Sequence, residues 1–243
     1  MPIVHVTKRS KIQWEEFSQN HWNPVRGKCS HDCKYCNTDK DFNKGKISII
    51  ENEIEKDLGE NNFIFVCSMT DLFTDDTPIE IIERVISKCN SYPTNKYLFQ
   101  TKNPERYEEF NNILPESSMY GITLESNRIY PGTYAPSPVS RVNTFSNLLI
   151  KRKMVSIEPI MDFDIVALLG MVKEIKPRIL IIGADNNHSN LIEPSVTKTK
   201  MFINEIKRLL PLTLIVKRNN LFRLLEGNID KDARPIYTDV KHK

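Results

Sequence analysis

The stretch that sets the architecture of this chain reads Cys29-Ser30-His31-Asp32-Cys33-Lys34-Tyr35-Cys36. Its three cysteines have a C-x3-C-x2-C spacing, and an aromatic residue directly precedes the last of them. Thiolates are the usual ligands of iron–sulfur clusters, which commonly take four of them. The other two cysteines, Cys67 and Cys89, lie far along the chain in different patterns. The spacing therefore predicts a four-iron cluster that is held by three thiolates and keeps one iron open to a further ligand.

Zinc is the other metal that this spacing admits. Structural zinc sites use four thiolate or imidazole ligands, and the same loop offers His31 beside Cys29, Cys33 and Cys36. His31 is so close in sequence to these cysteines that a tetrahedron around one ion is hard to close. A zinc site would indicate a nucleic-acid-binding module without catalysis, and this alternative stays open beside the cluster hypothesis.

Hydrophobic periodicity after the loop predicts strands and helices that alternate about six times. We expect a short first strand at 21–28 and later strands at 63–67, 96–100, 119–124, 154–157, 179–182 and 212–216. We expect helices at 47–58, 78–90, 141–150, 165–175 and 197–210, with a short one after Pro104. Continuous apolar strands are typical of parallel sheets buried on both faces, and right-handed crossovers curl such a sheet towards a barrel. The sequence therefore predicts an α/β fold, a partial (β/α)6-type TIM-like barrel with parallel strands and outer helices.

No change of composition marks a second domain, so the 243 residues are expected to form one. We assign residues 1–20 to an N-terminal cap, 21–225 to the barrel and 226–243 to a C-terminal tail. The irregular stretch 126–140 is rich in proline and tyrosine. It is expected to be an ordered loop or a lid over the site.

The composition is ordinary for a soluble globular protein, with 40% hydrophobic and 27% charged residues. A net charge of +3 is too small to demonstrate a nucleic-acid partner by itself. The sequence has no run of about 18 apolar residues, and its first residues lack a signal-peptide core. Five cysteines, three of them clustered, fit a reducing compartment better than a disulfide framework. These features predict a cytoplasmic protein that does not contact a membrane.

Polar side chains follow nearly every predicted strand. In barrels of this kind, reactive groups collect where the strands end. The polar residues at these ends are Cys67, Ser68, Thr70, Asp71, Thr101, Lys102, Glu125, Ser156, Glu158, Asp185, Lys217 and Arg218. Their coincidence on one rim with the cysteine loop predicts a binding site there.

The loop resembles the C-x3-C-x-aromatic-C signature of the radical SAM superfamily and agrees with it residue for residue. The resemblance implies that Cys29, Cys33 and Cys36 ligate a 4Fe-4S cluster and that Tyr35 lies against the adenine of S-adenosylmethionine (SAM). It also implies that SAM binds the open iron and is cleaved reductively to a 5′-deoxyadenosyl radical, which takes a hydrogen atom from a substrate. A one-electron donor such as flavodoxin or ferredoxin is then an expected partner.

The strand ends offer the groups that SAM needs: oxygen acceptors for its ammonium, a cation for its carboxylate and a carboxylate for its ribose. The candidates are Ser68, Thr70 and Asp71 for the ammonium, Lys102 (which follows Thr101) or Lys217 for the carboxylate, and Glu125 or Glu158 for the ribose. Superfamily members typically carry Gly-Gly-Glu at the second strand end, where this chain has residues 68–71. The ammonium contacts therefore stay open.

The stretch from Cys67 to Asp71 resembles the corresponding stretch of the spore photoproduct lyases, in which a cysteine precedes a hydroxyl–aspartate pair. In those enzymes the cysteine donates a hydrogen atom to a product radical, and Cys67 stands one residue further from its Thr-Asp pair. The resemblance makes Cys67 a candidate hydrogen donor. A buried structural cysteine at the end of an apolar strand is the alternative.

A nucleic acid or a damaged base is the substrate class that this resemblance favours. Basic residues that fit it are Arg128, Arg141, Lys151, Arg152 and Lys153. A solvated charged face explains the same residues, and a small metabolite or a peptide stays open as the substrate.

Further pieces resemble a small phage-associated branch of the superfamily that has no defined substrate. They are Lys11-Ile12-Gln13-Trp14, Trp22-Asn23-Pro24-Val25, Ser68-Met69-Thr70-Asp71-Leu72-Phe73, Thr101-Lys102-Asn103-Pro104-Glu105-Arg106 and Ser156-Ile157-Glu158-Pro159. This resemblance implies a shared fold and does not extend to a substrate.

Overall fold

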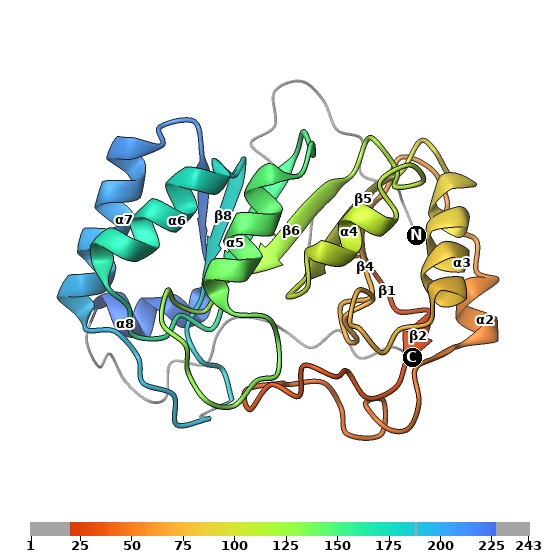
Figure 1. Cartoon of the computed structure of the whole chain (residues 1–243), viewed down its shortest axis with the longest axis horizontal. Helices are drawn as coiled ribbons and strands as arrows, with labels where there is room; N and C mark the ends of the chain where they lie inside the picture. Colours follow the sequence, from red (N-terminus) through yellow and green to blue (C-terminus); the bar gives the residue numbers. More distant parts are fainter. Residues whose placement is uncertain (1–19, 188, 227–243) are drawn as a thin grey trace.

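Seven strands form one sheet, and their order in the sheet, β1-β4-β5-β6-β7-β8-β9, follows their order in the chain (Figure 1). The computed structural model describes residues 20–187 and 189–226. The strands are β1 (His21–Trp22), β4 (Phe63–Val66), β5 (Lys96–Thr101), β6 (Met119–Thr123), β7 (Lys153–Ile157), β8 (Ile179–Ile182) and β9 (Leu214–Lys217). Each neighbouring pair in the sheet is parallel. Parallel neighbours require a crossover between them.

Helices occupy these crossovers, and Figure 1 shows α3 to α7 side by side over one face of the sheet. They are α3 (Ile79–Asn90), α4 (Glu105–Glu109), α5 (Pro138–Asn147), α6 (Ile165–Ile175) and α7 (Val196–Leu209), with α8 (Phe222–Glu226) after the 3-10 turn Asn219–Leu221. This succession confirms the predicted α/β fold with parallel strands and outer helices. No helix in the described ranges is long and apolar enough to cross a bilayer.

Alternate strand residues are buried on opposite faces of the sheet, as the two-residue period of a strand requires. Tyr97, Phe99 and Ile122 belong to the main core between sheet and helices. Leu98 and Met154 belong to a separate cluster on the other face, with Met119, Ile179 and Ile181. Both faces are therefore apolar in the middle of the strands, and polar residues are confined to the strand ends.

The predicted first strand, 21–28, and first helix, 47–58, are both wrong in extent. Pro24 has no N–H to donate to a ladder, and the chain leaves the sheet after β1. It forms β2 (Val25–Arg26), which pairs antiparallel with β3 (Ser48–Ile49). Only α2 (Glu51–Ile54) is helical in the second segment, because the β-branched isoleucines before it favour extended backbone.

Helix α5 begins three residues earlier than predicted. The hydroxyl of Ser137 accepts a hydrogen bond from the backbone N–H of Ser140 at 3.2 Å, and Pro138 occupies the first helical position. Both are favoured helix-start features. The earlier start places Arg141 in the first turn of α5, next to the ends of the strands. The predicted N-terminal cap and C-terminal tail lie almost entirely outside the described residues.

Candidate functional site

The cysteine loop lies across the edge of the sheet where the parallel strands end (Figure 1). His31 contacts Asp71, which follows β4. The hydroxyl of Tyr35 contacts Glu125, which follows β6. The backbone carbonyl of Tyr35 accepts a hydrogen bond of 3.1 Å from the side-chain amide of Asn187, which follows β8. One loop thus spans the ends of strands from β4 to β8.

Two consecutive tight turns shape the cysteine loop. The N–H of Asp32 donates to the carbonyl of Cys29 at 3.2 Å, and the N–H of Cys36 donates to the carbonyl of Cys33 at 2.9 Å. All three thiols are free of disulfides; Cys29 and Cys33 are half-buried, and Cys36 is exposed. Burial, followed by the charge of Asp71, raises the pKa of Cys29 to about 12. A coordinating metal is therefore needed to deprotonate this thiol near neutral pH, as metals do.

Cys29, Cys33 and Cys36 are the residues that would hold an iron–sulfur cluster or a zinc ion. Within the described ranges, no three His, Cys, Asp or Glu side chains converge closely enough to hold one ion. A single zinc requires its sulfur ligands at about 2.3 Å, whereas a cube takes one thiolate at each of several separate corners. The ring of His31 has its Nε2 3.0 Å from Asp71 Oδ2, and it forms no converging set with the cysteines within the described ranges.

Asp71 is the carboxylate that receives His31, and its oxygens are fully occupied. Its Oδ2 lies 3.0 Å from His31 Nε2 and accepts hydrogen bonds of 2.9 Å from the Thr101 hydroxyl and from the Lys102 N–H. Its Oδ1 accepts from the N–H of Phe73 at 3.0 Å. Burial opposes the charge of Asp71, but these donors, led by His31, hold the pKa of Asp71 below its ordinary value. Asp71 thus accepts hydrogen bonds from within the protein on both oxygens, and its contact with the ammonium of SAM stays a prediction.

Glu125 is the centre of a buried charge cluster. Its Oε1 accepts a hydrogen bond from the Tyr35 hydroxyl, and its Oε2 accepts one of 2.9 Å from Arg141. The ammonium of Lys102 lies 3.8 Å from Oε1 and 5.4 Å from the centroid of the Tyr35 ring. Although burial opposes ionisation, Arg141 and Lys102 lower the pKa of Glu125. Two cations, Arg141 and Lys102, therefore lie around this carboxylate.

Lys102 is the more exposed of these two cations. Its side chain is 16% exposed, and its ammonium donates no hydrogen bond to any described residue. Burial works against its charge, but negative charge on Cys33 and Glu125 raises the pKa of Lys102, so the lysine stays protonated. An ammonium with three unused donors next to the cysteine loop is suited to bind an anion.

The other predicted site residues after β4 are Ser68, Thr70 and Cys67, and each has a different environment. Ser68 bonds to His21 at 2.7 Å and to Asn23 at 3.2 Å. The hydroxyl of Thr70 is buried and has no hydrogen-bond partner among the described residues. Cys67 lies in the core on the helix side, with a positive φ of 53°. Its role as a hydrogen donor stays a prediction, and its place in the core favours a structural role.

Glu158 and Lys217, the predicted residues at the ends of β7 and β9, form no hydrogen bond or ion pair with the cysteine loop among the described residues. Glu158 lies 3.3 Å from both Arg218 Nε and the side-chain amide of Asn220. A Cβ on Gly183 would come within 2.5 Å of the Glu158 carboxylate, so only glycine allows this packing. Lys217 is exposed and has the register of the helix-side residues of β9. Arg218, the next residue, is the cation that reaches the rim.

The loop between β6 and α5, the predicted lid, is joined to the cysteine loop. The N–H of Lys34 donates to the carbonyl of Gly132 at 2.7 Å, and the Thr133 hydroxyl donates to the carbonyl of His31 at 3.0 Å. Thr133 Oγ1 also lies 3.4 Å from the sulfur of Cys33. A Cβ on Gly132, whose φ is +109°, would meet the Lys34 side chain at 3.0 Å. The loop is thus ordered against the cysteines, as expected from the sequence.

Ion pairs hold the other end of this loop. Arg128 bonds to Asp162 at 2.5 Å and to Asp164 at 2.6 Å. Lys198 bonds to Asp162 at 2.5 Å, and the Tyr130 hydroxyl donates to the carbonyl of Asp162 at 2.8 Å. Arg128 is therefore paired with two carboxylates of the protein, and its contact with a nucleic acid stays a prediction.

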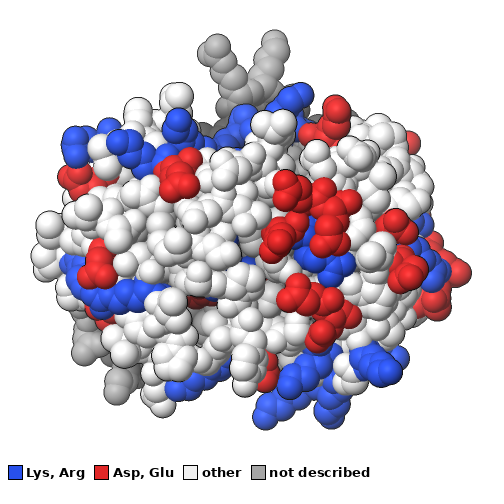
Figure 2. Space-filling model, in the orientation of Figure 1, with Lys and Arg blue, Asp and Glu red and all other residues white. Residues whose placement is uncertain are grey.

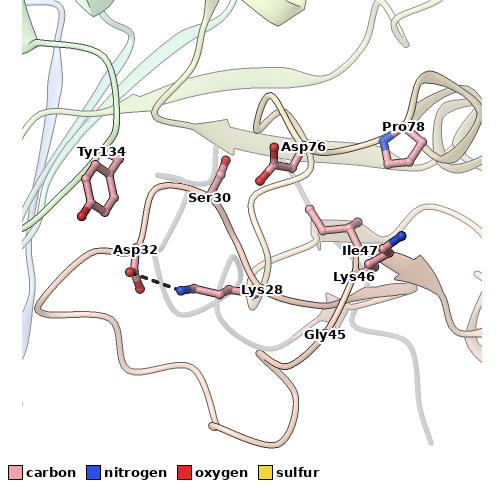
Figure 3. Close-up of a pocket in the computed structure, with 9 residues that line it drawn as sticks. All are labelled: Lys28, Ser30, Asp32, Gly45, Lys46, Ile47, Asp76, Pro78 and Tyr134. Carbon is pink, nitrogen blue, oxygen red and sulfur yellow. Dashed lines mark ion pairs between the residues drawn. The ribbon is translucent and has the colours of Figure 1, made fainter.

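A cavity of about 510 Å3 opens on the outer side of the cysteine loop (Figure 3). Lys28, Ser30 and Asp32 line it, together with Asp76 and Tyr134. Lys28 and Asp32 form an ion pair of 3.4 Å there. Alternate loop residues thus face this cavity, while the residues between them include the cysteines and His31. The cavity is separate from the Glu125 cluster.

Arg141 is the main site residue that the sequence does not identify. It is 1% exposed, although the sequence places it among surface cations. Its guanidinium donates to Glu125, to the carbonyl of Thr123 at 2.6 Å and to the carbonyl of Pro136 at 2.7 Å. A buried arginine needs this many acceptors. The Ser137-Pro138 helix-start pattern is the sequence signal that could have identified this position, because it places Arg141 in the first turn of α5, next to the strand ends.

The fold is similar to that of spore photoproduct lyase in several solved structures. One solved structure of that lyase, a double mutant with bound AdoMet and dinucleoside spore photoproduct, has a TM-score of 0.59 and 9% identity and covers 80% of this chain and 75% of its own. Another, a cysteine-to-serine mutant, has a TM-score of 0.59 and 11% identity and covers 88% and 81%. Identities this low establish the shared fold alone.

The chain itself belongs to the family described as "Protein of unknown function (DUF5131)", whose model matches residues 9–183. The match includes the cysteine loop, Asp71, Lys102 and Glu125. No curated protein matches the sequence. Its predicted place in a phage-associated branch stays a prediction.

Proposed function

We propose that this protein is a radical SAM enzyme in which Cys29, Cys33 and Cys36 hold a 4Fe-4S cluster. The observation that carries the proposal is the position of three free thiols on one loop, directly against the buried cluster of Tyr35, Glu125 and Lys102. When bound, the cluster and SAM would supply reductive cleavage to methionine and a 5′-deoxyadenosyl radical; the protein supplies binding, orientation and exclusion of solvent. A one-electron donor such as flavodoxin or ferredoxin is required for this chemistry.

Each residue of the buried cluster then has a distinct task. The ammonium of Lys102 binds the carboxylate of SAM. Glu125 fixes the orientation of the Tyr35 ring through the phenol hydroxyl, so that the ring is held as a platform for adenine. The buried, unpartnered hydroxyl of Thr70 supplies an acceptor for the SAM ammonium, a task for which Asp71 has no oxygen left. The loop between β6 and α5 keeps water from the reacting atoms.

Anaerobic reconstitution tests the proposal. The wild-type protein is expected to take about four irons and four sulfides per chain and to absorb near ~400 nm, as thiolate-bound cubes do. After reduction it is expected to convert SAM to 5′-deoxyadenosine, measured by chromatography. A colourless protein with about one zinc per chain that unfolds on chelation would support the zinc alternative and overturn this proposal.

We further propose a nucleic acid as the substrate, because the segment that contains the cysteine loop carries a net positive charge. Residues 26–46 contain six Lys or Arg and three Asp, so this segment carries a charge of +3, which is that of the whole chain. Figure 2 shows Lys and Arg along the lower edge, where the loop lies in Figure 1, and Asp and Glu over α4. Lys34, Lys40 and Lys46 form no ion pair within the described ranges. They provide cations for phosphates next to the site.

Replacing Lys34, Lys40 and Lys46 together by alanine is expected to weaken binding of a single-stranded oligonucleotide. Three lost phosphate contacts should reduce the slope of log K against log salt by about 2 units, at ~0.7 per contact for single strands. Fluorescence anisotropy between low and moderate salt measures this slope. The control replaces the exposed Lys173, Lys200 and Lys207 of α6 and α7 by alanine. An equal reduction of this slope in both variants, or no reduction in either, would contradict the proposed binding surface.

A further inference from the structure

His31 stands at the junction of three segments of the site. It lies between Cys29 and Cys33 in the sequence and is 4% exposed. Its Nε2 is 3.0 Å from Asp71 Oδ2. Its backbone carbonyl accepts hydrogen bonds from the N–H of Tyr134 at 2.8 Å and from the hydroxyl of Thr133 at 3.0 Å. The ring thus joins the cysteine loop to the sheet, while the backbone joins it to the loop before α5.

A single oxygen atom connects this ring to the proposed SAM-binding lysine. Asp71 Oδ2 receives the ring of His31 and also the backbone N–H of Lys102, at 2.9 Å. The Thr101 hydroxyl, also at 2.9 Å, completes the donors around this oxygen. The position of the cysteine loop relative to Lys102 is therefore set through Asp71. A loop without this contact would be tied to the β4 and β5 ends less firmly.

We propose that His31 is a positioning residue that fixes the three cysteines relative to Lys102 through Asp71. The inference rests on the proposed function of the same site. It assigns His31 to the support of the loop and not to a metal, because its Nε2 faces Asp71 and no metal-ligand group that could include it converges among the described residues. Partners that orient ligands in this way are typically worth about 10–100-fold in metal affinity or activity.

The variants His31→Ala and His31→Gln test the proposal. Alanine removes the contact with Asp71, whereas the side-chain amide of glutamine can reach the same oxygen. The reconstituted His31→Ala protein should keep the iron content of the wild type, because its three thiols are intact. Its dissociation constant for SAM, measured by equilibrium dialysis, should rise at least about tenfold, and the SAM-induced change in the spectrum of the reduced cluster should shrink. His31→Gln should restore both.

Hydrogen exchange of the protein before iron loading tests the same contact without the cluster. Amides of residues 29–36 should exchange faster in His31→Ala than in the wild type and in His31→Gln, while those of α6 should not change. Ser30→Ala is the matched control: Ser30 is adjacent in sequence, faces the outer cavity and should change neither exchange nor SAM binding.

The outcomes separate this inference from the proposed function. Unchanged exchange in His31→Ala would overturn the positioning role, as would wild-type affinity for SAM. If His31→Ala lost as much iron per chain as a variant of one of the three cysteines, His31 would be a metal ligand and the positioning role would be overturned. If the wild type binds no iron, the proposed function fails. The exchange experiment still decides whether His31 anchors the loop.

Discussion

Alanine at Cys29, Cys33 or Cys36 is expected to remove most of the iron and to abolish SAM cleavage. A cube that leaves one iron open for SAM has three thiolate ligands, so each replacement opens a second corner. Because loss of an outer partner already costs about 10–100-fold, loss of a ligand should lower 5′-deoxyadenosine formation more than about 100-fold. The measurements are iron and sulfide per chain and the product yield after anaerobic reconstitution.

Cys89→Ala is the matched control for this experiment. Cys89 lies on α3, is 0% exposed and is remote from the loop in sequence, so its replacement removes a thiol without touching the site. It should retain the iron content of the wild type. Full iron in any loop variant, or equal loss in Cys89→Ala, would show that the three cysteines are not the ligand set.

The regular part of the fold follows from local sequence because each strand is a continuous apolar run. Ile179 to Ile182 are buried on both faces of a parallel sheet, which is the environment that such runs indicate. Phe63 to Val66 alternate between half-buried and buried residues. The short elements next to the site do not follow in this way. A two-residue ladder such as Val25–Arg26 with Ser48–Ile49 depends on where the chain leaves the sheet, and that is a tertiary effect.

The position of the site could be predicted from the sequence, but the hydrogen bonds and ion pairs between its residues could not. The cysteine spacing and the polar strand ends identify Tyr35, Lys102 and Glu125 as neighbours, because parallel strands end on one edge. Their partners depend on side chains from distant segments. Asp71 looks like a free acceptor in the sequence, yet it is saturated by four donors in the structure. Arg141 looks like a surface cation, yet it lies behind Glu125.

Glu125→Gln is expected to destabilise the protein strongly at neutral pH. Arg141, 1% exposed, would lose its only anionic partner among the described residues while staying buried. Breaking a buried ion pair from one side typically costs about 3–5 kcal/mol, and we expect a loss of about 3 kcal/mol because the amide oxygen can still accept one hydrogen bond. The free energy of unfolding in urea measures the effect, and the SAM affinity should fall with it as Tyr35 and Lys102 lose their anchor.

The pH dependence gives this prediction a definite sign. The pKa of Glu125 in the folded protein lies below its ordinary value of 4.5, so the carboxylate stabilises the fold fully above that value. The contribution is lost as the pH falls through the folded pKa. Glutamine does not titrate at this position, so the stability gap between wild type and variant should be full at pH ~7 and should narrow below pH ~4.5. Glu51→Gln, in an exposed pair with Arg84, is the control and should leave the unfolding transition in place. If the difference in the free energy of unfolding between wild type and variant did not change with pH, the loss would arise from packing. The charge of Glu125 would then not be what holds Tyr35 and Lys102 at the cysteine loop.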